Sequence, residues 1–213
     1  MTDSSATQRR VVLASGNVKK VAEMRPLLAP LGLRLDGLET VANCPEIVED
    51  GDSFLANATI KATVVARATG GWAIGEDSGL CVDALDGAPG LYSARFAGSH
   101  GDDTANNAKL VAALEDVAES RRTAHYRSVI VLCDAAGDVL AFAEGRCHGR
   151  IVTDARGENG FGYDPHFLIR EYHRTFGQLP VAVKAAISHR SRAIRQFVPM
   201  VRAVVTDHDA SPT

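Results

Sequence analysis

The sequence lacks the features that would direct it to a membrane or to nucleic acid. No apolar run approaches the roughly 20 residues that a membrane-spanning helix needs, and the N-terminal stretch MTDSSATQRRVVLASG is too polar for a signal peptide. The 213 residues include 23 Lys and Arg against 26 Asp and Glu, a formal net charge of −3. Without a general positive field, any phosphate-bearing ligand needs a local group of cations or a metal ion. We therefore expect a cytoplasmic protein with no nucleic-acid or membrane partner.

The spacings of disulfide frameworks and zinc sites are also missing. The four cysteines form no C-x-x-C pair, and the seven histidines form no H-x-x-x-H pair. Free cysteines, mostly in the core, are typical of an intracellular chain. A metal site built from histidine or cysteine is therefore not expected.

Length and composition predict a single folded domain of mixed α/β class. The chain is 46% hydrophobic and 23% charged, and it is long enough to bury a sizeable core. We expect one domain over residues 9–205, with flexible tails at 1–8 and 206–213. The expected helices cover residues 18–28, 53–69, 103–118 and the chain from about 188 onward. The expected strands cover residues 10–15, 72–76, 80–85 and 165–169, with a hairpin around 136–138.

The first motif is the turn ASGNVKK at residues 14–20. A strand that ends in small residues at the start of a helix presents free backbone N–H groups, and these bind anions. Lys20, one turn into the helix, could reach such an anion. The alternative is a plain turn in which Asn17 caps the helix and the lysines are solvated, because short glycine motifs also occur by chance.

The second motif is EDSG, in which the adjacent acids Glu76 and Asp77 end an apolar run. Carboxylates that share a hard cation would account for this arrangement, with Glu49 as the additional acid. Mg²⁺ prefers oxygen ligands and needs only one or two carboxylates beside substrate phosphates. A carboxylate there could also take a proton from an attacking water. The alternative is that Asp77 or Ser78 caps a turn while Glu76 points to solvent.

Two further stretches lie toward the C-terminus. The glycine-rich stretch GENGFGYDPHF at residues 157–167 lets the backbone approach a ligand and offers an aromatic face to a flat base; the alternative is a structural turn with Tyr163 and Phe167 packed inside. Residues 188–190, SHR, begin the last helix, with Lys184 four residues earlier. Here the alternative is Ser188 as an N-cap followed by solvated basic residues. Together the four motifs contain the parts of a magnesium–nucleoside triphosphate site.

The same segments resemble the inosine-triphosphate pyrophosphatase family. The resemblance rests, in order, on LASGNVKKVAEM, EDGDSFLANATIKA, GEDSGLCVDALDGAPGLYSARFAG, GFGYDPHF and KAAISHRSRA, and it runs from about residue 10 to 200. It implies an elongated mixed sheet with helices, in two lobes flanking a deep substrate cleft. It also implies a homodimer that depends on Mg²⁺ and hydrolyses ITP, dITP and XTP to the monophosphate and pyrophosphate, which cleanses the nucleotide pool.

The resemblance also implies a role for individual residues. Asp77 matches the catalytic carboxylate and, with Glu49 and Glu76, the metal ligands. The substrate-binding positions are Ser15, Gly16, Asn17, Lys20, Ser78, Phe161, Gly162, Tyr163, Asp164, Lys184, His189 and Arg190.

Four positions depart from the family pattern, namely Lys19, Glu76, His166 and Val183, and none removes a group that the chemistry requires. Two other functions stay open from the sequence: a catalytically silent nucleotide-binding module, and a pyrophosphatase for other modified nucleotides. Release of pyrophosphate would distinguish an enzyme from the silent binding module. Assays with nucleotides that carry different bases would show whether the enzyme is instead a pyrophosphatase for other modified nucleotides.

Overall fold

The fold is mixed α/β, as the sequence predicts, and is built on a seven-stranded sheet of order β2-β1-β3-β4-β5-β6-β7. The structure, a computed structural model, describes residues 8–210, apart from the side chains of Lys19, Glu23 and Asp209. Its strands are β1 (Arg9–Leu13), β2 (Leu33–Gly37), β3 (Trp72–Val82), β4 (Thr123–Cys133), β5 (Val139–Ile151), β6 (Phe167–Ile169) and β7 (Arg174–Thr175). Strand β1 pairs in parallel with β2 and β3, whereas β6 pairs antiparallel with β5 and β7.

The helices are α1 (Val18–Leu28), α2 (Phe54–Thr69), α3 (Asp103–Ala113), α4 (Val181–Ile187) and α5 (His189–Ala210), with short 3₁₀ turns between them. The chain divides into two compact units. Unit 1 holds the residues up to Asp77, with Val129–Glu144 and the chain from Ala193 onward. Unit 2 holds Ser78–Ser128 and Gly145–Arg192. Among residues 8–210, no helix is both long and apolar enough to cross a membrane.

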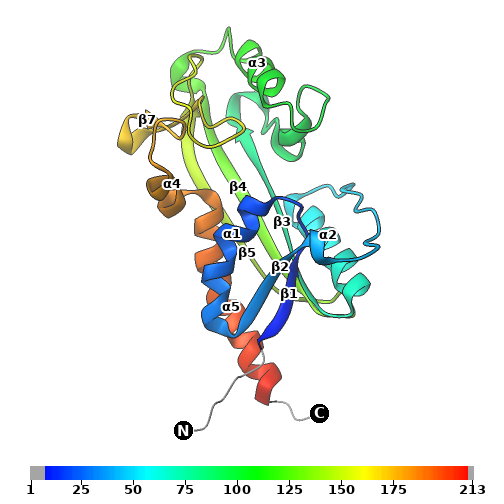
Figure 1. Cartoon of the computed structure of the whole chain (residues 1–213). Coiled ribbons are helices and arrows are strands. Elements are labelled where there is room, and N and C mark those ends of the chain that lie inside the picture. Colours follow the sequence, from blue (N-terminus) through cyan, green and yellow to red (C-terminus); the bar gives the residue numbers. More distant parts are fainter. Residues whose placement is uncertain (1–7, 211–213) are drawn as a thin grey trace. The chain divides into compact units, whose positions relative to one another are not determined.

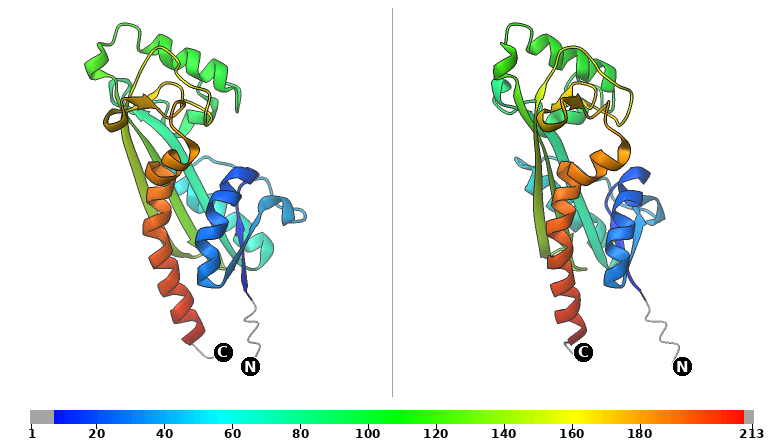
Figure 2. Two further views of the ribbon diagram at one scale, coloured as in Figure 1. Left: turned by 60° about the vertical axis from the view of Figure 1, so that its left-hand side comes forward. Right: turned by 90° about the vertical axis from the view of Figure 1, so that its left-hand side faces the viewer.

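In unit 1 the core lies between the strands and the two helices α1 and α5 (Figures 1 and 2). The predicted apolar stripe of α1 is buried there, and Met24 and Leu28 are fully enclosed. Ile74 of β3 and Phe197 of α5 belong to the same cluster. This packing stabilises α1 in spite of Pro26 within it, because burial of an apolar face outweighs a local loss of backbone hydrogen bonding.

Helix α2 packs against β3 through small residues. Ser53 caps its start by accepting the Ala56 N–H at 3.1 Å, and Gly70 ends it in the left-handed conformation. Gly75 lies so close to α2 that a Cβ there would collide with the Ala58 carbonyl oxygen. The absence of a side chain at residue 75 therefore sets how closely α2 approaches β3.

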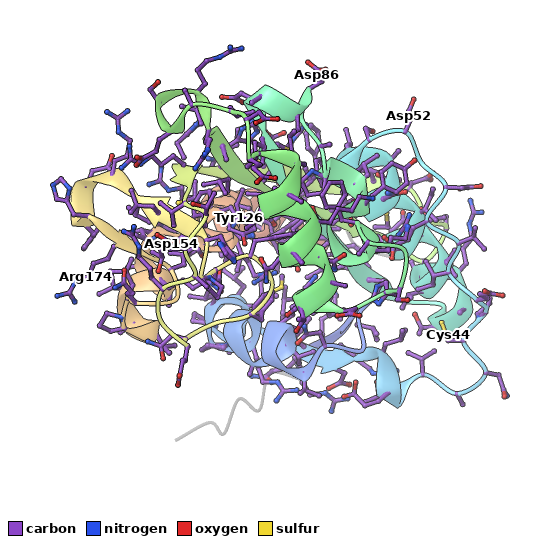
Figure 3. All side chains as sticks on the ribbon, turned by 90° about the horizontal axis from the view of Figure 1, so that it is seen from above. Cys44, Asp52, Asp86, Tyr126, Asp154 and Arg174 are labelled. Atoms are coloured by element: carbon purple, nitrogen blue, oxygen red, sulfur yellow. The ribbon has the colours of Figure 1, made fainter. Side chains whose placement is uncertain are left out.

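Unit 2 has its own core, formed by β3–β6, α3 and the segments after β5. Tyr126, Phe167 and Phe176 make an aromatic group at its centre, with ring centroids 4.6 to 6.1 Å apart. Helix α3 begins at the N-cap Asp102, whose carboxylate accepts the Ala105 N–H at 3.0 Å. In Figure 3, α3 (green) lies beside the loop before β6 (yellow).

Four boundaries differ from the sequence prediction. Residues 77–79 form no turn: β3 runs through them as one strand of 11 residues. Helix α3 ends at Ala113 rather than 118, after which Leu114 enters the core. The short helix α4 was not expected. Helix α5 continues to Ala210, so 206–210 are helical, whereas the rest of the predicted tails, 1–7 and 211–213, falls outside the described residues.

Candidate active site

Strand β3 places Glu76 and Asp77 on opposite faces. Adjacent side chains of a strand alternate in direction, and Ile74 already points into the core beneath α1. Glu76 has the same direction as Ile74, and its Oε2 lies 3.0 Å from Lys20 Nζ of α1. Asp77 points to α2, where its Oδ1 lies 2.9 Å from Lys61 Nζ. Each buried carboxylate thus has its own lysine, which explains why two adjacent acids are tolerated at the end of an apolar run.

Lys61 is the centre of the polar network on the α2 side. Besides Asp77, its Nζ contacts Glu49 Oε2 at 2.6 Å and donates to the Glu76 carbonyl oxygen at 3.2 Å. Asn57, one turn earlier on α2, donates from Nδ2 to the other oxygen of Asp77 at 3.4 Å. Both oxygens of Asp77 therefore accept from residues four apart on one helix face. Asn57 and Lys61 are 2% and 8% exposed.

Burial controls the charges in this network. It raises the pKa of Asp77 above the usual range for aspartate, and the nearby Lys61 ammonium only partly opposes that rise. For Lys61, burial alone would lower the pKa, but the carboxylates of Asp77 and Glu49 outweigh it and raise the pKa instead. Lys61 consequently stays charged, while Asp77 is a stronger proton acceptor than an exposed aspartate.

The expected magnesium ligands are not all brought together. Glu49 and Asp77 contact the same lysine nitrogen, so their carboxylates lie side by side. Glu76 lies across the strand with Lys20, because β3 is continuous where the sequence predicted a turn. Within residues 8–210 no group of three or more His, Cys, Asp or Glu side chains is arranged to hold a metal. The assignment of Glu76 as a metal ligand together with Glu49 and Asp77 therefore stays a prediction.

The turn before α1 has the predicted form. Ser15 Oγ accepts the Asn17 N–H at 3.2 Å, and Asn17 Oδ1 accepts the Lys20 N–H at 3.4 Å. Asn17 therefore does cap the helix start, as the simpler interpretation of this motif predicts. Gly16 and Asn17 are exposed, and nothing lies within 4 Å of the position of a Cβ on Gly16. The backbone at this helix start is open to a ligand, with Lys20 held beside it by Glu76.

In unit 2 the loop of residues 161–164 is tied by internal contacts. Asp164 is 2% exposed; its Oδ2 accepts the Phe161 N–H at 2.8 Å and forms an ion pair with Lys184. Burial raises the pKa of Asp164, although the Lys184 ammonium and the Phe161 N–H act to lower it. The Phe161 ring is 46% exposed, and Lys184 Nζ lies 4.6 Å from its centroid. This loop thus presents one aromatic ring to solvent beside a cation.

The ring of Tyr163 is not available for stacking on a base. It is 4% exposed, packs in the core of unit 2 and donates its hydroxyl to the Ser93 carbonyl oxygen at 2.8 Å. Tyr163 and Phe167 are both packed inside, as the structural alternative for this loop predicts. Any contact of Tyr163 with a base would involve its backbone.

The start of α5 brings the remaining predicted residues into unit 2. Ser188 Oγ accepts the Ser191 N–H at 3.2 Å, so Ser188 caps the helix start. His189 and Arg190 are each 6% exposed rather than solvated. The imidazole of His189 stacks on Tyr126 with centroids 4.8 Å apart and planes at 14°. Ser78 is half-buried in β3.

The sequence-based search missed Asn57, Lys61 and Tyr126. A signal for the first two was present: they lie four residues apart, next to the predicted buried positions Ala58 and Ala62. Polar residues on the apolar face of a helix are unusual unless they have buried partners. Tyr126 gave no comparable signal, since an aromatic residue in a strand is ordinary.

Comparison with known proteins identifies the family of the chain. A family model described as the Ham1 family matches residues 11–200, and the chain belongs to that family. A protein of Rhodopirellula baltica named dITP/XTP pyrophosphatase is 49% identical over 201 residues, which cover 94% of this chain and 97% of that protein. The family predicted from the motifs is thereby confirmed.

Two solved structures have the same fold. The structure of a HAM1 protein from Coxiella burnetii is similar with a TM-score of 0.84 and 38% identity, covering 93% of this chain and 99% of that one. A crystal structure of a nucleoside-triphosphatase, or dITP/XTP pyrophosphatase, from Mycobacterium abscessus gives a TM-score of 0.77 and 42% identity. The likeness covers 90% of this chain and 99% of that one.

Proposed function

We propose that the protein is a nucleoside triphosphate pyrophosphatase that converts ITP, dITP and XTP to the monophosphate and pyrophosphate in the cytoplasm. The observation that carries this proposal is the identity, over nearly the whole chain, to a protein named dITP/XTP pyrophosphatase. The buried carboxylate of Asp77, held by Lys61, supports the proposal, because a positioned carboxylate can take a proton from an attacking water.

The proposed substrate-binding residues form a phosphate-binding group and a base-binding group. Ser15, Gly16, Asn17 and Lys20 bind phosphate oxygens through open backbone N–H groups and one ammonium. Phe161 stacks on the purine, and seven further residues contact the rest of the nucleoside. These residues are Ser78, Gly162, Tyr163, Asp164, Lys184, His189 and Arg190.

Asp77 acts as the general base. It accepts the proton of the water that attacks a phosphorus atom, the P–O bond to the leaving pyrophosphate breaks, and the nucleoside monophosphate stays behind. Its raised pKa suits this role, because a base works best when its pKa lies near the working pH. Asn57 and Lys61 fix the orientation of the carboxylate, and the Lys61 ammonium partly opposes the rise that burial causes in the pKa of Asp77.

The donor set on the α2 side fits Mg²⁺. The carboxylates of Glu49 and Asp77 lie side by side, each with one oxygen on Lys61 Nζ, and Mg²⁺ needs only one or two such ligands when substrate phosphates supply others. When bound, the ion neutralises negative charge on the triphosphate. Enzyme in excess EDTA should therefore lose activity, and added Mg²⁺ should restore it.

A substrate panel tests the activity. Pyrophosphate release should be fastest with ITP, dITP and XTP, and far slower with GTP, ATP and dUTP. Binding of these nucleotides without pyrophosphate release would instead indicate a silent binding module, and a preference for dUTP would indicate a different pyrophosphatase. The protein also acts as a homodimer in this proposal, so light scattering after gel filtration should give twice the chain mass of 22.6 kDa.

A further inference from the structure

Helix α3 holds the loop of residues 161–164 by the backbone of Gly162. The Gly162 N–H donates to Asp103 Oδ2 at 2.7 Å, and its carbonyl oxygen accepts from Asn107 Nδ2 at 2.9 Å. Asp103 and Asn107 lie four residues apart, so they project from the same face of α3. Two side chains thus satisfy both backbone polar groups of a single residue.

Gly162 is the point where the chain turns from solvent to core. Its φ of +61° lies in the left-handed region, which glycine adopts without strain. The residue before it, Phe161, is 46% exposed, and the residue after it, Tyr163, is 4% exposed. The orientation of the Gly162 backbone consequently determines where the exposed ring of Phe161 points.

An open volume lies beside the segment that follows this loop. A cavity of about 860 Å³ lies between α3 and the segment that leads into β6, where Figure 3 shows the helix (green) and loop (yellow) next to each other. Asn107, Pro165 and His166 are among its lining residues. The hydrogen bonds with Asp103 and Asn107 tie Gly162 to α3, in addition to the contact that Asp164 makes with the Phe161 N–H.

We infer that Asp103 and Asn107 are positioning residues for recognition of the purine base. They act through Gly162 on Phe161 and do not touch the substrate themselves. This inference rests on the proposed function, in which Phe161 stacks on the base. It assigns to α3 a part in base selection that none of the four sequence motifs indicates.

The expected kinetic effect differs from that of a purely structural role. A loosened loop must become ordered when the substrate binds. This cost weakens the contact with the base equally in the ground state and in the transition state. Such a loss of uniform binding raises KM and leaves kcat nearly unchanged. The ratio of kcat/KM between preferred and rejected purines should also fall, since discrimination depends on fixed polar contacts with the base edge. A fall in the folded fraction would instead lower the apparent kcat and leave KM unchanged.

The sharpest variant is Asn107→Asp. It keeps the shape of the side chain but replaces the donor that faces the Gly162 carbonyl oxygen with an acceptor. Ala108→Asp is the matched control, because it adds the same charge at the next position, which lines the same cavity and is exposed. We expect KM for ITP to rise about tenfold in Asn107→Asp, the size of one lost hydrogen bond. The kcat should stay within about twofold, and the ITP-to-ATP ratio of kcat/KM should fall.

Three further variants keep the test decisive if Asn107→Asp folds poorly. Asn107→Leu removes the donor without adding charge and should raise KM as well. Asp103→Asn retains an acceptor for the Gly162 N–H and should behave like wild type, whereas Asp103→Leu should not. Circular dichroism at the assay temperature reports whether each variant is folded.

The outcomes separate this inference from the proposed function. If wild type releases pyrophosphate from ITP while KM and the base ratio of Asn107→Asp and Asn107→Leu equal those of Ala108→Asp, the positioning role is wrong. A lower kcat at unchanged KM would also overturn it. Wild-type protein that releases no pyrophosphate from any purine triphosphate would overturn the proposed function itself, and the positioning role with it.

Discussion

Replacing Lys61 by methionine tests the polar network on α2 most directly. Methionine has a similar length but no charge and no donor, so Asp77, Glu49 and the Glu76 carbonyl oxygen all lose their contact with Nζ. Loss of one partner of a buried ion pair costs about 3–5 kcal/mol. The side chain of Glu49 is 37% exposed and therefore screened by water, which places the expected loss near the lower end, about 3 kcal/mol.

That loss converts into a measurable change in thermal unfolding. For a chain of this length each kcal/mol lowers Tm by roughly 2–4 °C, so Lys61→Met should melt about 6–12 °C below wild type at pH 8. Arg67→Met is the control: it removes a cation from the same helix at an exposed position, where its Nε donates to the Ala136 carbonyl oxygen. Its loss should stay below about 1 kcal/mol.

The effect should depend on pH in a defined direction. Burial already raises the folded-state pKa of Asp77, and removal of Lys61 takes away the nearest group that lowers it. The folded variant then holds a proton at pH values where the unfolded chain has lost it. Its stability is therefore greatest below the unfolded pKa and falls as pH rises through the folded pKa. The Tm deficit should be smaller at pH 5 than at pH 8.

Activity gives an independent measure of the same shift. If Asp77 is the general base, the acidic limb of kcat/KM should lie above the ordinary range for aspartate in wild type and still higher in Lys61→Met. A variant that melts within 1 °C of wild type, or a Tm deficit of equal size at both pH values, would refute the electrostatic account of this network. An acidic limb that stays in place would refute the link between Lys61 and the ionisation of Asp77.

Three further variants test individual assignments. Asp77→Asn, which is nearly isosteric, should lower kcat by at least ~10²-fold with an unchanged circular dichroism spectrum; retention of near-full turnover would remove Asp77 from the mechanism. Lys20→Ala should lower kcat/KM for ITP and for other triphosphates by similar factors, because phosphates carry no base identity; an effect confined to one base would count against this role. Arg190→Ala should lose most ITP activity and narrow the preference over ATP, and an unchanged ratio would show that the 6-keto group is recognised elsewhere.

The sequence predicted the helices best where an apolar period was long. The stripe Phe54, Ala58, Ala62, Val65 gave the buried face of α2 correctly, and all four are buried. The sequence prediction was wrong at residues 77–79, because Asp-Ser-Gly is typical of a turn. The pairing of β3 with β1 ends at Ile74, and β4 is its other neighbour in the sheet, so tertiary context overrides the local preference at residues 77–79. Helix α4 is only seven residues long, too short for a periodic pattern to show.

The candidate site was predicted in its residue types but not in its pairings. Motif spacing placed Lys20 and Asp77 in the site, yet it could not show that Glu76 pairs with Lys20 while Lys61 pairs with Asp77. Those pairings follow from the alternation of a strand that the sequence did not predict to be continuous. Lys61 is 16 residues from its partner, and a lysine within a helix usually lies in water. Contacts of this kind depend on tertiary packing, which local patterns do not report.

The close approach of Gly75 to α2 has a consequence for how the gene tolerates mutation. Glycine at this position takes no part in the chemistry, because it has no side chain that could carry a charge or form a hydrogen bond. Yet a single methyl group there would meet the Ala58 carbonyl oxygen and push away the helix that carries Asn57 and Lys61. Random mutagenesis scored by loss of activity should therefore return changes at residue 75 together with changes at the acids. Recovery of function would then require a second change that moves the helix back, rather than any new reactive group.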